Sequence, residues 1–334
     1  MMTGHEAWIG PTWSRGEHGE LGPALRDCLT AAIAAPSIHN TQPWLFRPFP
    51  GGVDVLADAS RRLEVIDPRG RELTISVGAA LLNLRLAILA HGRSPRQRLL
   101  PDPDQPAVLA RVWIGPPAEV TDTVRLLTAA IPRRHTIRQP FTHDSVPVEV
   151  IHDLVTAAAA EDGRLMLADD TTRESVLALV RTAELHARRD PRYWRELAEW
   201  THPSRHRHDG VPPETFGPWS ALEAVPIRDF GLMEPVRRRT VAWFEEEPTI
   251  LVLYTAGDDP TAWLRAGEAL QRTLLTACVR GVSTTLMTQP LEIPSLRARL
   301  DDSASGAVAQ AIIRIGYGPP GASTPRRPLE QVLR

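Results

Sequence analysis

Two arginine clusters contain the residues whose types and spacing point most directly to chemistry. In the first, IPRRHTIRQPF, the residues Arg133, Arg134 and Arg138 surround the hydroxyl of Thr136. A guanidinium group can donate two parallel charge-assisted hydrogen bonds, and a hydroxyl group adds one more donor. This donor set is what a phosphate monoester requires, so the segment is a candidate anion site.

The second cluster is the pair Arg326 and Arg327 in TPRRPLEQVL, close to the end of the chain. A single arginine pair is more often a solvated surface patch than a binding site. Two clusters that stand at the start and at the end of one stretch of alternating elements favour a shared anion. We therefore expect both clusters to meet at one phosphate-sized group.

A third segment, APSIHNTQPW, follows directly on an apolar, helix-like run and contains Ser37, Asn40 and Gln42. Polar side chains packed this densely beside an aromatic residue either cap a helix and turn the chain or bind a flat polar ligand. Pro43 and Trp44 are expected to be structural, fixing the exit from the loop and packing in the core beneath it.

Helical and strand periodicities alternate along the chain, which predicts an α+β or α/β class. The predicted helices cover residues 21–35, 73–91, 147–160, 171–188 and 260–280. The predicted strands cover residues 53–57, 108–114, 164–168, 249–255 and 309–317, with a loop at 115–119.

Two of the predicted helices are related in sequence. VGAALLNLRLAILAHGRS aligns without gaps with AGEALQRTLLTACVRGVS, which pairs Gly78 with Gly267 and Gly92 with Gly281. Each helix is followed by a strand ending in Ile-Gly. Two amphipathic helices can share leucine and alanine by chance, but glycines paired at one spacing favour one fold used twice. We expect the two halves to pack as a pseudo-dimer.

The segment at about 190–248 has no counterpart in the first half, and scattered Trp, His and Pro residues break its periodicity. A long insert in a compact domain is usually functional, often a lid, or is disordered, and the large aromatic residues favour a lid. His202, His206 and His208 lack a spacing that would converge them on a metal ion. We expect a solvated basic loop here and no metal site.

Together these segments resemble the motifs of the nitroreductase family of FMN-dependent oxidoreductases. RRHTIRQPF is similar to the amino-terminal phosphate motif of that family. The resemblance implies phosphate and ribityl contacts for Arg134, Thr136 and Arg138, and it places His135 in the same cofactor-binding segment. Here His-Thr-Ile stands where the family more often has a Ser-x-Arg pattern.

APSIHNTQPW is similar to the family signature of Pro-Ser, a spacer, Asn, one residue and Gln-Pro-Trp. The resemblance implies flavin contacts by the side chains or backbone of Ser37, Ile38, Asn40 and Gln42. GVSTTLMTQPLE falls where the family lines the flavin ring, and Arg326 and Arg327 resemble the basic pair that closes on the phosphate. The residues implied at the ring edge are Met287, Thr288 and Gln289.

The order of these motifs suggests how they combine. In homodimeric relatives, each flavin site takes the arginine motif from one subunit and the Ser/Asn motif from the other. Here residues 1–118 contain only the Ser/Asn motif and residues 119–334 contain only the arginine motif. The resemblance thus implies an α+β, nitroreductase-like pseudo-dimer with one FMN between its halves, similar to the Acg-type branch of the family.

The function implied by the resemblance is transfer of reducing equivalents from NADPH or NADH through FMN to a small organic acceptor. A nitroaromatic compound, a quinone or a biosynthetic intermediate could be the acceptor in such a ping-pong reaction. The flavin itself carries the hydride, so no catalytic side chain is expected. The alternative is a non-catalytic protein that stores or sequesters FMN under the lid. An interaction module without a cofactor is a third possibility.

Composition restricts the partners further. The formal net charge of −2 predicts no long-range attraction to nucleic acid or to an anionic membrane. We see no apolar run near the roughly 20 residues of a membrane span and no apolar signal core. We therefore expect a cytoplasmic protein with a small-molecule partner, present as a monomer or as a homodimer.

Two further motifs favour structural roles. Cys28 and Cys278 each lie in an apolar helix-like run, which predicts buried thiols without a disulfide bond or a metal. GYGPPG has the spacing of a dinucleotide-binding loop. Pro319 and Pro320 would prevent the helix that has to follow such a loop, so this function is not expected.

Overall fold

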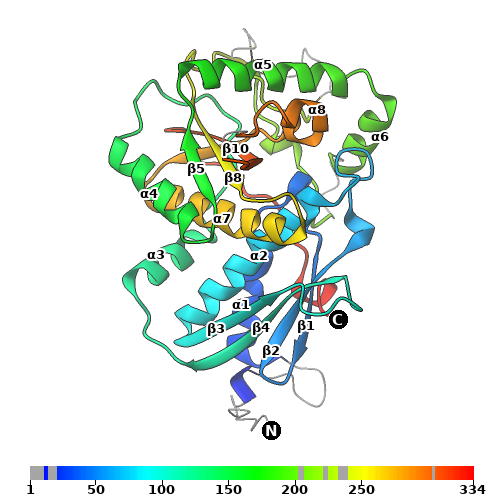
Figure 1. Ribbon diagram of the computed structural model, residues 1–334, viewed down its shortest axis with the longest axis vertical. Coiled ribbons are helices and arrows are strands. Elements are labelled where there is room, and N and C mark those ends of the chain that lie inside the picture. The colour runs from blue at the N-terminus through cyan, green and yellow to red at the C-terminus, as the bar shows by residue number, and fades with distance from the viewer. Residues whose placement is uncertain (1–10, 14–20, 202–206, 221–224, 232–239, 303–304) are drawn as a thin grey trace.

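The computed structural model describes residues 11–13, 21–201, 207–220, 225–231, 240–302 and 305–334. Two four-stranded antiparallel sheets lie at opposite ends of the molecule. Two long helices, α2 (Arg71–Ala90) and α7 (Pro260–Val279), pack against each other between the sheets (Figure 1). The predicted α+β class is confirmed.

The first sheet has the strand order β1-β2-β4-β3. Its strands are β1 (Trp44–Phe49), β2 (Gly52–Ala57), β3 (Arg93–Leu99) and β4 (Val108–Pro117). Gly51 has a φ of +89° in the two-residue loop between β1 and β2, a conformation that glycine adopts without steric cost. Helices α1 (Pro23–Ile33) and α2 share a hydrophobic core with this sheet. Trp44 is fully buried in that core, as predicted.

The second sheet has the strand order β5-β8-β10-β9. Its strands are β5 (Arg164–Leu167), β8 (Thr249–Thr255), β9 (Ser283–Leu286) and β10 (Val308–Gly316). Helix α4 (Val148–Ala159) and α7 share a core with the sheet on its inner side. A separate core forms with helix α5 (Asp170–Ala187), so this sheet is covered by helices that the first sheet lacks.

Both sheets arise from the same order of elements. The first series is α1-β1-β2-α2-β3-β4, and the second is α4-β5-β8-α7-β9-β10. The strand orders β1-β2-β4-β3 and β5-β8-β10-β9 correspond position by position. Helix α3 (Asp122–Ala130) lies between the two series and contacts both α2 and α7.

The segment between β5 and β8 is where the two series differ. It contains α5, α6 (Pro191–Trp200) and the short parallel pair β6 (Trp219–Ser220) and β7 (Val241–Ala242), so the added segment begins before residue 190. The sequence analysis expected no regular structure in the segment at about 190–248. This expectation is wrong for the first part of the segment, which forms helix α6. Asp190 caps α6 by accepting a hydrogen bond from Arg192 N at 2.8 Å, and Tyr193 and Leu197 bury one face of the helix.

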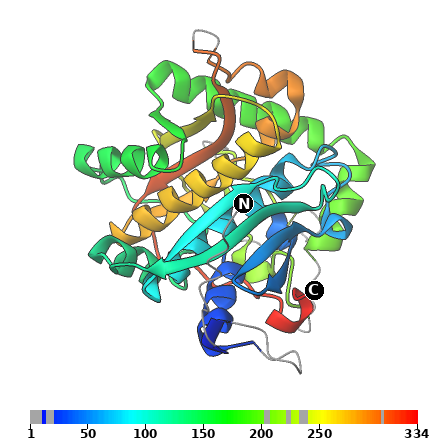
Figure 2. The same ribbon diagram turned by 60° about the horizontal axis from the view of Figure 1, so that its bottom comes forward.

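The end of the chain returns from the second sheet to the first. Residues 317–328 contain no helix, as the prolines of GYGPPG predict. Phe46 N then donates to Val332 O at 2.7 Å, and Arg334 N donates to Phe46 O at 2.9 Å. Figure 2 shows this terminal segment beside the strands of the first sheet. A short helix, α8 (Pro294–Arg297), precedes β10.

The expectation that no apolar run approaches the length of a membrane span is wrong for helix α2. Among the described residues it is the one helix that is long and apolar enough to cross a membrane. In the structure, however, 83% of the most apolar 18-residue stretch of this helix is buried. Its hydrophobicity is therefore that of a core helix packed against α7 and the first sheet.

Candidate functional site

The arginine segment runs along the edge of the second sheet. Ile137 N donates a hydrogen bond to Thr284 O of β9 at 2.8 Å, and a parallel bridge joins Thr136 to Thr284. The Ile137 side chain is buried and anchors the segment. Thr136 and Arg138 line one pocket, whereas Arg134 lines a second, smaller pocket together with His135 and Ile137.

Arg326 arrives at this site on the terminal segment. Its Nη1 donates to Asn40 Oδ1 at 3.1 Å, and its Nη2 donates to Ala34 O at 3.3 Å. Burial, and then the charge of Arg134, lower the pKa of Arg326 to about 9. The structure therefore places Arg326 near Arg134, although the two residues are almost 200 positions apart in the sequence.

Arg134 is buried and Arg326 is half-buried, and the two cations lie near enough for the charge of one to lower the pKa of the other. Burial lowers the pKa of Arg134 to about 10. The Nε atoms of both side chains are buried without a hydrogen-bond partner, and neither residue belongs to an ion pair within the described part of the chain. Two neighbouring guanidinium groups in a low-dielectric environment repel each other, so an anion bound between them would offset this electrostatic repulsion.

Arg327 differs from Arg326. Its Nη1 lies 3.4 Å from Asp58 Oδ2 and donates to Gln42 O at 3.1 Å, and its Nη2 donates to Gln331 O at 2.8 Å. The backbone N of Arg327 donates to Gln42 Oε1 at 2.7 Å. A carboxylate already pairs this guanidinium, so the contacts of Arg327 are those of a residue that positions the terminal segment.

The polar loop between α1 and β1 has an unusual backbone. His39, Asn40 and Gln42 have φ values of +46°, +54° and +52°, the left-handed region that residues with a side chain seldom occupy. Gln42 N donates to Ser37 Oγ at 2.9 Å and closes the loop. Such strain costs about 1–3 kcal/mol per residue and is typical of functional sites.

Asn40 and Gln42 hold three distant segments together. Asn40 Nδ2 donates to Gly210 O at 2.9 Å and to Pro325 O at 3.0 Å. Gln42 Nε2 donates to His208 O at 2.8 Å. Protein groups thus occupy the polar atoms that the resemblance assigned to the flavin, and both side chains position the loop against its neighbours.

A pocket, here called the central pocket, opens where these segments meet. Five of the predicted site residues line it, namely Ser37, Ile38, Thr136, Arg138 and Thr288. Arg228 and Phe230 of the segment between β5 and β8 line it as well, together with Ser76 of α2. Ser76 Oγ accepts a hydrogen bond from Ile38 N at 3.1 Å. The pocket is therefore built from both series of elements and from the added segment.

His39 is a pocket residue that the sequence reasoning missed. Its side chain is 6% exposed, and neither ring nitrogen has a hydrogen-bond partner. The ring packs edge-on against Phe230, with the centroids 5.2 Å apart. Burial, followed by the charges of Arg228 and Arg138, lowers the pKa of His39 well below its ordinary value. A neutral imidazole with an unused donor and an unused acceptor therefore faces the central pocket.

The residues predicted at the ring edge have different environments. The Met287 side chain is fully buried in the core between the second sheet and α5, so it does not line the central pocket. Gln289 Nε2 donates to Pro226 O at 3.2 Å, and Thr288 Oγ1 donates to Glu292 Oε1 at 3.0 Å. Only Thr288 of the three lines the central pocket.

His135 lies next to the cation pair Arg134 and Arg326. Burial, and then the charges of Arg134 and Arg326, lower the pKa of His135. The ring lines a small pocket together with Arg134 and the loop at 318–321. His135 therefore adds no positive charge at neutral pH to a site that already has two cations.

The two cysteines are free thiols in helices, as predicted. Cys28 is fully buried, and burial followed by the charge of Asp27 raises the pKa of its thiol to about 12. Cys278 is half-buried, less than predicted, and both thiols are free. His202 and His206 lie outside the described residues. No cluster of three or more metal-binding side chains occurs in the part of the chain that the structure describes.

The fold and the site define an α+β protein in which two series of elements jointly enclose a pocket beside a pair of cations. The nitroreductase family model matches residues 131–317, which begin at the arginine segment and end just after β10. The matched region is more than half of the chain. The chain belongs to the nitroreductase family, which confirms the predicted family and enzyme class. The polar loop lies outside the matched region.

Relatives in Mycobacterium tuberculosis strain H37Rv extend over nearly the whole chain. "Putative NAD(P)H nitroreductase Rv3131" is 36% identical over 319 residues, covering 92% of this chain and 90% of the relative. A second protein of that strain, named acg, is 31% identical over 318 residues, with coverage of 92% and 95%. A nitroreductase with bound FMN from Bacteroides fragilis covers 62% of this chain and 94% of its own, with a TM-score of 0.37 and 13% identity.

Proposed function

We propose that the chain is an FMN-dependent oxidoreductase of nitroreductase type. NADPH or NADH supplies the reducing equivalents, and a small organic acceptor receives them in a second half-reaction. Nitroaromatic compounds, quinones and oxidisable biosynthetic intermediates are the candidate acceptors. The observation that carries the proposal is the cation pair Arg134 and Arg326, which has no carboxylate partner among the described residues. Arg134 lies two residues from Thr136 of the central pocket.

The phosphate of FMN fits the donor set at the cation pair. Arg134 and Arg326 each have an unused buried Nε–H, and the hydroxyl of Thr136 is close in the chain. A phosphate would neutralise the repulsion between the two guanidinium groups and would satisfy their open donors. Arg327 is paired with Asp58 and would stay in its positioning role.

The lining of the central pocket suits the ring system of FMN, but the cavity measures about 90 Å³ and must widen to admit a three-ring system. When bound, the isoalloxazine supplies the hydride-transfer chemistry. Ile38, Leu270 and Leu286 provide apolar walls that exclude water from the pocket. The backbone of the strained loop, held by Asn40 and Gln42, would set the position of Ser37 and Ile38 at the ring.

Arg138 gives the central pocket a cation. One of its donors is used, since Nη1 donates to Thr215 O at 2.9 Å, and the guanidinium lies 4.6 Å from the centre of the Phe230 ring. Burial, and then the charge of Arg228, lower the pKa of Arg138 to about 10, so it is charged at neutral pH. A fixed cation in a water-poor pocket would stabilise negative charge on a bound ring.

The visible spectrum of the purified protein tests the proposal. Flavin absorbance that bleaches when NADPH or NADH is added without oxygen, and returns when a quinone or nitroaromatic compound is added, is the expected result. A protein that remains colourless after incubation with excess FMN would refute the cofactor assignment.

A second candidate function is supported by the contacts of the added segment. Arg228 and Phe230 line the central pocket, and Gly210 accepts a hydrogen bond from Asn40, so the added segment covers the site in the way a lid would. A flavin that dithionite bleaches but that neither nicotinamide reduces within minutes would favour FMN storage or sequestration over catalysis.

We further propose that residues 1–118 and 119–334 are two related halves that together make a single cofactor site. The corresponding orders of elements and strands support this division. One chain then supplies both the polar loop and the arginine segment, so a monomer suffices for cofactor binding. One FMN per chain, measured on a monomer separated by size from any dimer, is the expected stoichiometry.

A further inference from the structure

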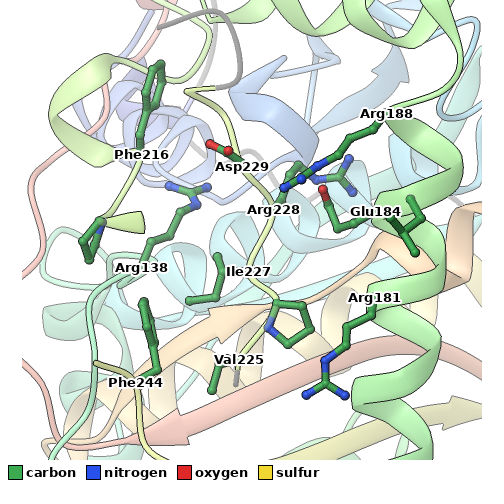
Figure 3. Close-up of a pocket in the computed structure, with 13 residues that line it drawn as sticks. Arg138, Arg181, Glu184, Arg188, Phe216, Val225, Ile227, Arg228, Asp229 and Phe244 are labelled. Atoms are coloured by element: carbon green, nitrogen blue, oxygen red, sulfur yellow. The ribbon is translucent and has the colours of Figure 1, made fainter. Parts of the chain in front are cut away.

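A second pocket lies beside the central pocket, between α5 and residues 216–218 and 225–229 (Figure 3). We call it the α5 pocket. Arg138 and Arg228 line both pockets and form the wall between them. None of the residues at the predicted cofactor site except Arg138 takes part in the α5 pocket, so it is a separate binding space next to the site.

The α5 pocket has the size and the surface for one aromatic ring. Phe216, Val225, Ile227 and Phe244 provide an apolar lining. The cavity measures about 180 Å³. An apolar cavity of about 150 Å³ is enough to bind benzene. The α5 pocket therefore has room for a single substituted ring and is too small for a nucleotide.

Glu184 is a polar side chain of the α5 pocket whose buried carboxyl oxygens lack hydrogen-bond donors in the part of the chain that the structure describes. It lies on one face of α5 with Arg181, Leu185 and Arg188, at the spacing i, i+3, i+4 and i+7. Glu184 is 6% exposed, and neither carboxyl oxygen lies within hydrogen-bond distance and geometry of a donor among the described residues, although Arg228 and Gln289 are near enough to favour its charged form. Figure 3 shows the carboxyl group extending from the helix into the pocket, towards Arg228.

The side-chain N–H donors near Glu184 bind other groups. Arg228 Nη1 donates to Tyr193 Oη at 2.9 Å, and its Nη2 forms a buried ion pair with Glu292. The Gln289 amide favours the charged form of Glu184, but its Nε2 donates to Pro226 O at 3.2 Å and does not reach the carboxyl oxygens with hydrogen-bond distance and geometry. Burial raises the pKa of Glu184, the direction expected for a carboxyl group that has lost water without gaining full compensation. Two acceptor atoms facing a cavity are thus available to a ligand.

The charges around the pocket restrict what that ligand can be. Arg228 is neutralised by Glu292, whereas Arg138 lines the pocket as a cation whose hydrogen bond, among the described residues, goes to a carbonyl oxygen, Thr215 O. A cationic ligand would be repelled by Arg138. The hydrogen-bond donors that Glu184 requires must therefore belong to neutral O–H or N–H groups.

We propose that the α5 pocket binds a single aromatic ring with two adjacent O–H or N–H donors, which the two carboxyl oxygens of Glu184 accept. The apolar lining holds the ring, and the paired donors give the site its specificity. The identity of this ligand rests on the proposed function. The ligand is the reduced form of the acceptor, a catechol produced from an ortho-quinone. The quinone gains two electrons and two protons, with a hydride from NAD(P)H and one proton from water, and both carbonyl groups become hydroxyl groups.

Binding of two matched probes to the purified full-length protein tests the inference. Catechol presents two adjacent O–H donors, and 1,2-dimethoxybenzene has the same ring without donors. We expect calorimetry to give a dissociation constant for catechol at least tenfold lower than for 1,2-dimethoxybenzene. Glu184→Leu should abolish this preference, and Glu184→Gln, which keeps the size and one acceptor oxygen, should reduce it. Glu174→Gln, on the exposed side of the same helix, should leave the preference unchanged.

Two results would overturn the inference. One is equal binding of both probes by the unmodified protein, and the other is an unchanged preference in Glu184→Gln and Glu184→Leu proteins that keep the native circular dichroism spectrum. The flavin spectrum separates the two proposals. A protein that takes up no FMN but prefers catechol through Glu184 refutes the proposed function alone. A yellow protein that NADPH bleaches but that does not distinguish the probes refutes this inference alone.

Discussion

Gly78 on α2 and Gly267 on α7 face each other where the two long helices cross. A Cβ atom on Gly78 would lie 2.2 Å from Leu264 O, and a Cβ atom on Gly267 would lie 2.0 Å from Ile75 O. Ile75 precedes Gly78 by the same three residues by which Leu264 precedes Gly267. This reciprocal contact has the form of an isologous interface, and it supports the proposal that the chain is a pseudo-dimer.

The first prediction concerns this crossing. Gly267→Ala should lower the free energy of unfolding by about 1–3 kcal/mol or more, because the helices must separate to admit the methyl group. Chemical denaturation of the purified variant measures the loss. Gly257→Ala is the control, since a Cβ atom there would lie 3.6 Å from its nearest neighbour, Asp259 Oδ2. Equal stability of the two variants would contradict the close approach of the helices.

The central strands of both four-stranded sheets were predictable from the sequence, and most of the edge strands were not. All ten predicted helices and strands are present, and nine of them begin and end within two residues of the prediction. The exception is β4, which continues to Pro117 through the predicted loop. In the two four-stranded sheets the strands that were missed are β1, β3 and β9, which all lie at sheet edges, whereas the edge strand β5 was predicted. Edge strands tolerate proline and polar residues, as with Pro48 in β1 and Pro95 in β3, so they lack a clear apolar alternation.

The candidate site was predictable only where a residue type alone fixes the chemistry. Arginines in clusters indicate an anion in any environment, and Arg134 and Arg326 do lie near each other in the structure. Asn40 and Arg327 have equally suggestive types, but their polar atoms are used by partners 170 and 269 positions away in the chain. His39 was missed for the converse reason, since only the burial of both its nitrogens makes it unusual.

The second prediction uses the cation pair Arg134 and Arg326. Arg134→Gln should weaken FMN binding at least tenfold, because a charge-assisted hydrogen bond to the phosphate contributes about 1.5–3 kcal/mol. The same change should leave the cofactor-free protein as stable as before or more stable, since it removes a buried charge without a partner. Quenching of flavin fluorescence and thermal unfolding measure the two effects. Arg133→Gln, at the exposed neighbouring position, should change neither. Unaltered FMN affinity in Arg134→Gln would place the phosphate elsewhere.

The third prediction concerns His39. His39→Phe should weaken FMN binding about 5- to 100-fold, the equivalent of one or two lost hydrogen bonds to a buried partner, about 1–3 kcal/mol. Stability of the cofactor-free protein should rise or stay the same, because the two unsatisfied nitrogens are removed. Equilibrium titration with FMN and denaturation in its absence measure these opposite effects. His143→Phe, at an exposed position, is the control. Lower stability with unchanged affinity would show that His39 is a structural core residue.

The fourth prediction concerns Asp67, near the start of α2. Asp67 Oδ2 accepts a hydrogen bond from Leu73 N at 2.8 Å, and the side chain is 4% exposed. Burial, followed by the charge of Glu72, raises the pKa of Asp67 to about 6. Between its unfolded and folded pKa values, the folded protein binds more protons than the unfolded chain. Asp67 therefore makes the protein less stable as the pH rises from about 4 to about 6.

Asp67→Asn removes this titration while it keeps an oxygen that can accept the hydrogen bond from Leu73 N. The stability of the variant relative to the unmodified protein should increase by about 3 kcal/mol between about pH 4 and pH 7, since one pKa unit corresponds to about 1.4 kcal/mol. Denaturant unfolding at a series of pH values measures the difference. Asp104→Asn, at an exposed position, is the control. A flat profile for Asp67→Asn would mean that the Asp67 carboxyl group is ionised in the folded protein as readily as in the unfolded chain.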